Sequence, residues 1–137
     1  MVMKRTMGLL AAAVLLLGRS AWAQAAAGPE PVTDGRPLSQ WVADLKAPAP
    51  QTRNAAAYEI AGLGPAAAPA VPALIEALGD SEATVRFPVT VALGEIGPPA
   101  AAAVPRLKQM MEEEINDEIS ASARRALRRI QPSAVTE

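Results

Sequence analysis

An internal repeat with a period of about 33 residues is the feature that most constrains how this chain folds. The block that begins at Leu38 recurs at Val71 and again at Val104, in two equal steps. The helix-breaking residues recur with the same period, because Gly64-Pro65 in one unit matches Gly97-Pro98 in the next. A unit of this length cannot bury its apolar side alone, so the repeat predicts a stack of similar units.

The apolar residues of each unit are spaced as on helices. One stripe follows steps of four, four and three, which place its members on a single helical face; it comprises Thr52, Ala56, Ile60, Leu63, then Val85, Val89, Leu93, Ile96, then Ile119, Ala123, Leu127 and Ile130. We interpret the other stripe as the second helix of each pair; it comprises Leu38, Trp41, Val42, Leu45, then Val71, Leu74, Ile75, Leu78, then Val104, Leu107 and Met111.

Proline positions agree with these boundaries, with one exception. Pro37, Pro72 and Pro105 stand where helices are predicted to begin, a position where the missing N–H has no intrahelical partner. Pro88 instead falls inside a predicted helix, and it predicts a kink or a late helix start. The third unit has one extra residue between positions 111 and 119, which predicts a loop insertion between its helices.

Residues 1–23 have the pattern of an export signal. Lys4 and Arg5 precede the apolar run Met7–Leu17, and Ala21-Trp22-Ala23 has small residues at the two positions that a signal peptidase reads. The run is shorter than the roughly 20 residues that a membrane-spanning helix needs. We therefore expect cleavage after Ala23 and a periplasmic or secreted protein, with retention of the segment as an anchor as the alternative.

The remaining chain divides into three parts. Residues 24–36 are rich in Ala, Pro and Gly and predict a flexible lead-in, residues 37–131 form the repeat domain, and residues 132–137 predict a disordered tail. Cleavage removes three of the 13 basic residues and leaves 10 against 14 acidic residues, a net charge of −4. A mildly acidic exported domain is not expected to bind nucleic acid.

The absence of cysteine and histidine excludes several common kinds of catalytic and metal site. The 137 residues contain neither type, so disulfides, thiolate metal sites and the commonest general base are missing. No paired set of carboxylates, lysines or serines stands at a recognisable catalytic spacing. We therefore expect no enzyme activity, no cofactor and no metal.

Two segments resemble a known repeat family. Residues 71–78, Val-Pro-Ala-Leu-Ile-Glu-Ala-Leu, and residues 91–98, Val-Ala-Leu-Gly-Glu-Ile-Gly-Pro, are similar to the short bacterial, PBS-lyase-type form of HEAT repeats. Ankyrin repeats share the period but need a histidine in their Thr-Pro-Leu-His motif. The resemblance covers Leu38 to about Ile130. It implies an all-α fold: a short right-handed α-solenoid of about three helical pairs, whose second helices line a concave surface used chiefly for protein binding.

The exposed side of the helices interpreted as second provides the candidate protein-binding residues. If a partner docks in the concavity, it contacts Gln40, Ala43, Asp44, Ala73, Glu76, Arg106 and Gln109. An ordinary solvated helix surface explains the same residues equally well. Trp41 occupies the core position of Leu74 and Leu107, so we assign it to packing rather than to ligand stacking.

Two charged clusters have both a functional and an ordinary explanation. An acidic cluster suits calcium ligation or a solvated helix end, and its spacing lacks the calcium-loop pattern; it comprises Glu112, Glu113, Glu114, Asp117 and Glu118. A basic cluster on the last helix suits an anionic partner or the polar outer face that a terminal repeat needs; it comprises Arg124, Arg125, Arg128 and Arg129. The recurrent Arg53 and Arg86 match an arginine of the family that has a structural role.

These observations favour an exported, non-catalytic protein-protein interaction module with an unidentified protein partner. Two alternatives stay open: a structural or self-associating accessory protein, and a subunit related to the lyase-type members that attach bilin pigments or process metal cofactors. The usage of Ala, Pro and Arg suits a bacterium.

Overall fold

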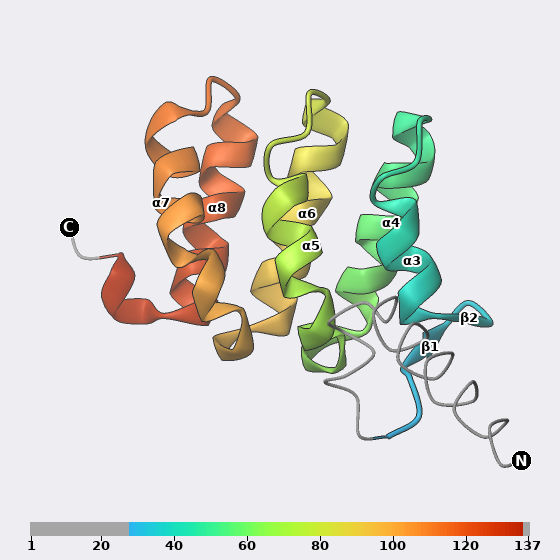
Figure 1. Ribbon diagram of the computed structural model, residues 1–137. Helices are drawn as coiled ribbons and strands as arrows, with labels where there is room; N and C mark the ends of the chain where they lie inside the picture. The colour runs from blue at the N-terminus through green and yellow to red at the C-terminus, as the bar shows by residue number, and fades with distance from the viewer. Residues whose placement is uncertain (1–27, 136–137) are drawn as a thin grey trace, which may run out of the picture.

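The computed structural model describes residues 28–135, which form three helical pairs stacked side by side (Figure 1). Two 3₁₀ segments join successive pairs, η1 (Gly64–Ala70) and η2 (Pro98–Ala103). The pairs are α3 (Leu38–Asp44) with α4 (Pro50–Gly62), α5 (Val71–Ala77) with α6 (Ala83–Ile96), and α7 (Val104–Glu113) with α8 (Asp117–Ile130). The predicted stack of helical pairs is confirmed. The predicted signal peptide and its cleavage site lie outside the described residues.

The order of the helices within each pair differs from the prediction. Helices α3, α5 and α7, which we expected to be second, are the first helices of their pairs, and short turns connect them to α4, α6 and α8 (Figure 1). The longer segments η1 and η2 separate the pairs instead. A period alone does not show where a unit begins, which is why the sequence pattern left the order undetermined.

The helices form two layers that differ in packing. Helix α6 packs directly against both α4 and α8, whereas α3, α5 and α7 contact mainly their partner helices and the 3₁₀ segments. In a curved stack the layer with the closer helices lies on the inside. We therefore call the exposed side of α4, α6 and α8 the inner face, and that of α3, α5 and α7 the outer face.

Both predicted apolar stripes meet between the layers and form the core. The four residues of the α6 stripe are fully buried, and so are Ile60, Ala123 and Leu127 of the neighbouring helices. On the first helices, Leu38, Trp41, Leu74 and Leu107 are buried as predicted, which confirms the packing role of Trp41. In α7, however, Met110 is buried and Met111 is only half-buried.

Pro88 lies inside a continuous helix. Helix α6 begins at Ala83 and runs through Pro88 to Ile96, so the predicted late start is wrong. Proline cannot donate a hydrogen bond to the carbonyl of Thr84, four residues earlier. The side-chain amide of Asn54 on α4 donates to that carbonyl at 2.5 Å. A neighbouring helix thus supplies the hydrogen bond that the proline removes.

The segment before α3 is ordered where the structure describes it, contrary to the flexible lead-in that we predicted. Strands β1 (Val32–Thr33) and β2 (Arg36–Pro37) pair antiparallel. The Trp41 indole donates to the Thr33 carbonyl at 3.2 Å, and the Arg36 guanidinium lies 3.9 Å from the Trp41 ring centroid. Composition predicted flexibility, but these contacts with α3 fix the hairpin.

The other end is also ordered further than predicted. Residues Pro132–Ala134 form a 3₁₀ turn, η3, and Ala134 and Val135 are partly buried against the core. The amide of Gln131 donates to the Leu127 carbonyl at 2.8 Å, which continues the backbone hydrogen bonding beyond α8. The predicted disordered tail is therefore wrong for residues 132–135.

Helices α6 and α8 approach each other closely where Gly94 faces Ala126. A Cβ atom on Gly94 would lie 3.2 Å from the Ala126 Cα atom, which is tighter than an ordinary contact. Gly94 is fully buried in the helix interior, whereas Gly62, in the last turn of α4, is exposed and would meet nothing within 4 Å. The absence of a side chain at Gly94 allows α6 and α8 to approach, whereas a side chain at Gly62 would contact no neighbouring helix.

We expect Gly94→Ala to lower the free energy of unfolding by about 1–3 kcal/mol, because the backbone of α8 must move away. The matched control Gly62→Ala should raise it by about 0.5–1 kcal/mol, since alanine is the better helix former. Urea denaturation followed by circular dichroism measures both. Equal effects of the two substitutions would contradict the close packing of α6 on α8.

Candidate functional site

A ladder of arginines runs along the edge of the stack where the turns within each pair lie. Arg53 donates to both carboxylate oxygens of Asp80 in the next unit, at 2.7 and 3.0 Å. Its third nitrogen donates to the carbonyls of Ala47 and Pro48 in the turn of its own unit, both at 2.9 Å. One side chain therefore fixes its own turn and joins it to the neighbouring turn.

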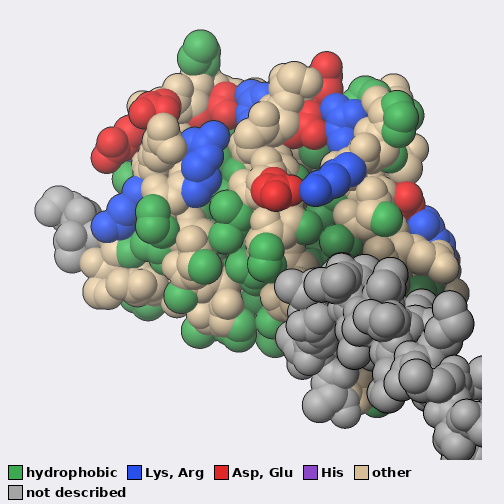
Figure 2. All heavy atoms as spheres, viewed as in Figure 1, with side chains coloured by type: hydrophobic (Ala, Val, Ile, Leu, Met, Phe, Trp, Pro, Cys, Tyr) green, Lys and Arg blue, Asp and Glu red, His purple; other side chains and the backbone are tan. Residues whose placement is uncertain are grey.

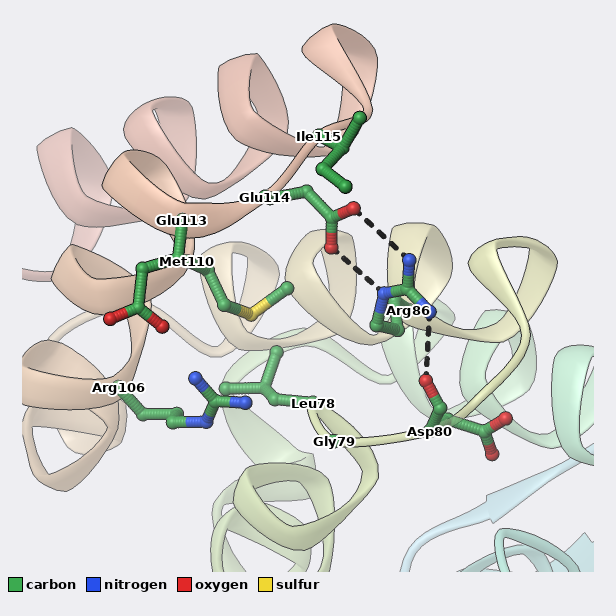
Figure 3. A pocket seen from close by; sticks show the side chains of 9 residues that line it. All are labelled: Leu78, Gly79, Asp80, Arg86, Arg106, Met110, Glu113, Glu114 and Ile115. Carbon is green, nitrogen blue, oxygen red and sulfur yellow. Dashed lines mark hydrogen bonds and ion pairs between the residues drawn. The ribbon is translucent and has the colours of Figure 1, made fainter.

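Arg86 repeats this arrangement one unit later (Figure 3). It donates to both oxygens of Glu114 at 2.8 and 3.0 Å, and to the carbonyls of Asp80 and Ser81. The acids in turn accept backbone hydrogen bonds, Asp80 from the Glu82 amide and Glu114 from the amide of the residue two positions later. The recurrent arginine thus has the expected structural role, because it joins the turns of neighbouring units.

The first unit lacks the acid of the ladder, and the third unit lacks the arginine. Ala47 occupies the position of Asp80 in the first unit and has no carboxylate to offer a preceding arginine. Ser120 occupies the position of Arg86 in the third unit, and its hydroxyl donates to the Met111 carbonyl at 2.9 Å. The ladder therefore contains two bidentate ion pairs.

Arginine contacts lower the pKa of both ladder carboxyls. The hydrogen bonds from Arg53 hold the pKa of Asp80 below its ordinary value, and those from Arg86 do the same for the pKa of Glu114. Partial burial acts in the opposite direction and is outweighed. The charged forms of the two acids are the ones that the fold stabilises.

The stability of the chain should fall in acid as these pairs are lost. A carboxyl whose folded pKa is lowered contributes stability above its unfolded pKa, and this contribution disappears as the pH falls through the folded value, from about pH 5 downward. We expect the doubly substituted Asp80→Asn, Glu114→Gln protein to be less stable than the parent at pH 7 and to lose less stability on acidification. Urea titrations across this pH range measure both slopes.

The control for this experiment replaces two exposed acids of the same region. Glu112→Gln with Glu113→Gln removes the same charge, but neither carboxylate contacts an arginine of the ladder. Its pH slope should stay close to that of the parent. A control slope as shallow as that of the ladder variant would show that general charge, rather than the ion pairs, sets the acid dependence.

A depression of about 250 Å³ lies beside the second ion pair of the ladder (Figure 3). Leu78 and Met110 form its floor, and Arg86 with Glu114 forms one wall. Ile115, on the turn above it, is 96% exposed. Arg86 and Glu114 in the wall of this depression already pair with each other, so we assign the depression to the structural ion pairs rather than to ligand binding.

A larger depression, of about 350 Å³, lies on the inner face. Its lining comes from all three second helices: Asn54 and Tyr58 from α4, Ala83, Thr84 and Phe87 from α6, and Asn116, Glu118 and Ile119 from the start of α8. Residues of the first and third units thus wall a hollow over the second, which is the geometry of a concave surface. Tyr58 is 48% exposed there.

A smaller depression, of about 120 Å³, lies further along the inner face between α6 and α8. Val91 and Glu95 line it from α6, and Arg125 and Arg129 line it from α8. Arg129 donates to both oxygens of Glu95 at 2.7 and 3.1 Å. Beneath them the hydroxyls of Thr90 and Ser122 share a buried hydrogen bond of 2.6 Å.

The seven predicted binding residues lie on the outer face, because their helices are the first of each pair. Figure 2 views this face, on which charged side chains gather toward the edge with the turns. Most of the polar members contact near neighbours. Arg36 binds Gln40 and Asp44, Lys46 binds Glu76 at 3.0 Å, and Arg106 donates to Gln109 at 3.0 Å, while Ala43 is exposed and Ala73 packs against the core. The structure thus places these seven residues on the first helices of the pairs, and protein binding by them stays a prediction.

The acidic cluster divides among different contacts. Glu114 belongs to the ladder, and the Asn116 side chain caps α8 by accepting from the Glu118 and Ile119 amides. Asp117 and Glu118 lie in the first turn of α8, where negative charge complements the helix dipole. Among the residues that the structure describes, no group of acids is placed to hold a metal ion.

The basic cluster of α8 divides between two surfaces. Arg124 and Arg128 are exposed at the positions of Thr90 and Gly94, which α8 buries in the preceding unit. Two long cations therefore replace the small side chains that a further unit would pack against. The polar surface expected at the end of a stack of repeats explains this half of the cluster, while Arg125 and Arg129 lie on the inner face.

Comparison with protein families identifies the architecture. A family model for HEAT repeats matches residues 38–128. The chain belongs to the HEAT repeat family. Neither curated proteins nor solved structures gave a match. Within residues 28–135 of this HEAT repeat protein, no helix combines the length and apolar character needed to cross a membrane.

Sequence reasoning missed the inner face because it assigned the wrong helix to it. The missed residues include Tyr58, Phe87 and Val91, whereas Arg125 was considered only as part of the basic cluster. A signal was present, since Tyr58, Val91 and Arg125 are equivalent positions of the three units and none belongs to a predicted apolar stripe. An aromatic and a β-branched residue at solvent-facing helix positions are the feature that points to this surface.

Proposed function

We propose that this HEAT repeat protein is an exported, non-catalytic module that binds another protein on its inner face. The observation that supports this most is the depression of about 350 Å³ over α6, walled by units one and three. Interfaces favour aromatic side chains that are partly exposed before binding, and Tyr58 and Phe87 both line this hollow. HEAT repeats typically mediate protein-protein interactions, which agrees with this proposal.

The chemistry of the inner face favours binding over catalysis. Its charged residues are few, and the buried hydroxyls of Thr90 and Ser122 bond to each other rather than to a base. Glu95 is held by Arg129 in a bidentate pair, and Asn54 is held by the Thr84 carbonyl. These partners fix the surface before binding, which lowers the ordering cost of recognition.

Site-specific photo-crosslinking distinguishes the inner face from the outer face. A benzophenone amino acid in place of Tyr58 or Thr84 should capture a protein of the exported fraction. The same probe in place of Ala43 or Gln109 on the outer face serves as the matched control and should capture little. Capture only from the outer positions of a folded protein would refute the proposal, and a product of two copies of this chain would favour self-association.

Export is tested separately from binding. The positively charged start, short apolar run and Ala21-Trp22-Ala23 sequence support cleavage after Ala23. N-terminal sequencing of protein from the exported fraction should begin at Gln24. Full-length protein confined to the cytoplasm or retained in the membrane would contradict this part of the proposal and leave the binding surface untouched.

A further inference from the structure

The inner face is a grid in which equivalent positions of the three units form rows. Tyr58, Val91 and Arg125 make one row, because they occupy the same place in the repeat once the extra residue of the third unit is allowed for. The row changes in character from aromatic to aliphatic to cationic as it crosses the stack. It joins the two inner-face depressions, since Tyr58 lines the larger one and Val91 and Arg125 line the smaller one.

Arg125 is the inner-face arginine whose charge is not already compensated by an ion pair. Arg129 is held by Glu95 in a bidentate pair, whereas Arg125 forms no salt bridge with another described residue. Arg125 is exposed and lies beside the half-buried Val91. A guanidinium next to apolar surface binds a carboxylate well, because its planar donors match both oxygens.

We propose that the inner face binds an extended segment of a partner protein that presents an apolar side chain to Tyr58 and Phe87 and a carboxylate to Arg125. This proposal rests on the proposed binding function and specifies the partner's chemistry. Neighbouring helix axes lie about 8–10 Å apart, so the row spans roughly 20 Å. An extended chain rises about 3.3 Å per residue, which places the two side chains about five or six residues apart.

The charges of the inner face favour a short acidic segment over a polyanion. Glu118 lines the larger depression and would repel a nucleic acid or an anionic membrane, whereas the charge of Glu95 in the smaller depression is already offset by Arg129. The described acidic residues also outnumber the basic ones, and two of the four α8 arginines point to the end of the stack. Arg125 can bind one carboxylate of a partner, and the hollow at Tyr58 and Phe87 can bind one apolar side chain of the same partner.

A random peptide library displayed on phage and selected on the purified chain tests the proposal. We expect selected peptides to carry an aromatic or aliphatic residue and an Asp or Glu about five or six positions apart. Arg125→Gln should weaken their binding about tenfold or more, measured by fluorescence anisotropy of a labelled selected peptide. Arg124→Gln is the matched control, since it removes the same charge from the end of the stack and should leave affinity unchanged.

A second pair of variants tests the apolar anchor. Tyr58→Ala should weaken the same peptides by a similar factor, whereas Ile115→Ala removes an exposed apolar residue at another edge and should not. The loss in Arg125→Gln should also shrink at high salt, because screening weakens the ion pair in the parent.

Three results overturn the inference. Selected peptides without acidic residues that still require Tyr58 would refute the carboxylate partner while leaving inner-face binding intact. Peptides unaffected by Tyr58→Ala and Arg125→Gln would refute both this inference and the proposed function. Binding of phosphatidylglycerol vesicles or a single-stranded oligonucleotide that is lost in Arg125→Gln would identify a polyanion as the ligand instead.

Discussion

Packing between successive second helices is the interaction on which the rest of this structure depends. The two apolar stripes of each pair meet between the layers, and α4 and α8 cover the two sides of α6 that its partner α5 does not reach. The approach is close enough that Gly94 faces the backbone of α8. Small residues at these contacts bring the three helices together, and their proximity produces the concave inner face.

Polar interactions then fix the register and the extent of the stack. The ion pairs of Arg53 and Arg86 join neighbouring turns, and the Asn54 side chain supplies the bond that Pro88 removes from α6. The first unit is covered by the hairpin before α3, where the Thr33 hydroxyl donates to Glu59 at 2.9 Å. The last unit carries arginines where a further helix would pack. The two ends of the described stack thus differ in chemistry from the contacts between its units.

The sequence was sufficient for the number of pairs and most of their core, because the period and the stripe positions follow directly from helix geometry. It was not sufficient for the order of helices, since a period has no beginning, and this error moved the candidate site to the outer face. Contacts between units were also hidden, because the partners of Arg53, Asn54 and Glu114 lie about one repeat away along the chain. The hairpin was missed because composition predicts flexibility wherever contacts such as that of Arg36 with Trp41 are unknown.

The contacts between neighbouring pairs should make the three pairs one cooperative unit. Native-state hydrogen exchange tests it most directly, because it gives a separate opening free energy for each buried amide. We expect the amides of Ile60, Leu93 and Leu127, one from each second helix, to exchange through a common opening with the same free energy and denaturant dependence. Independent openings of α4 or α8 at much lower free energy, with α6 still protected, would contradict it.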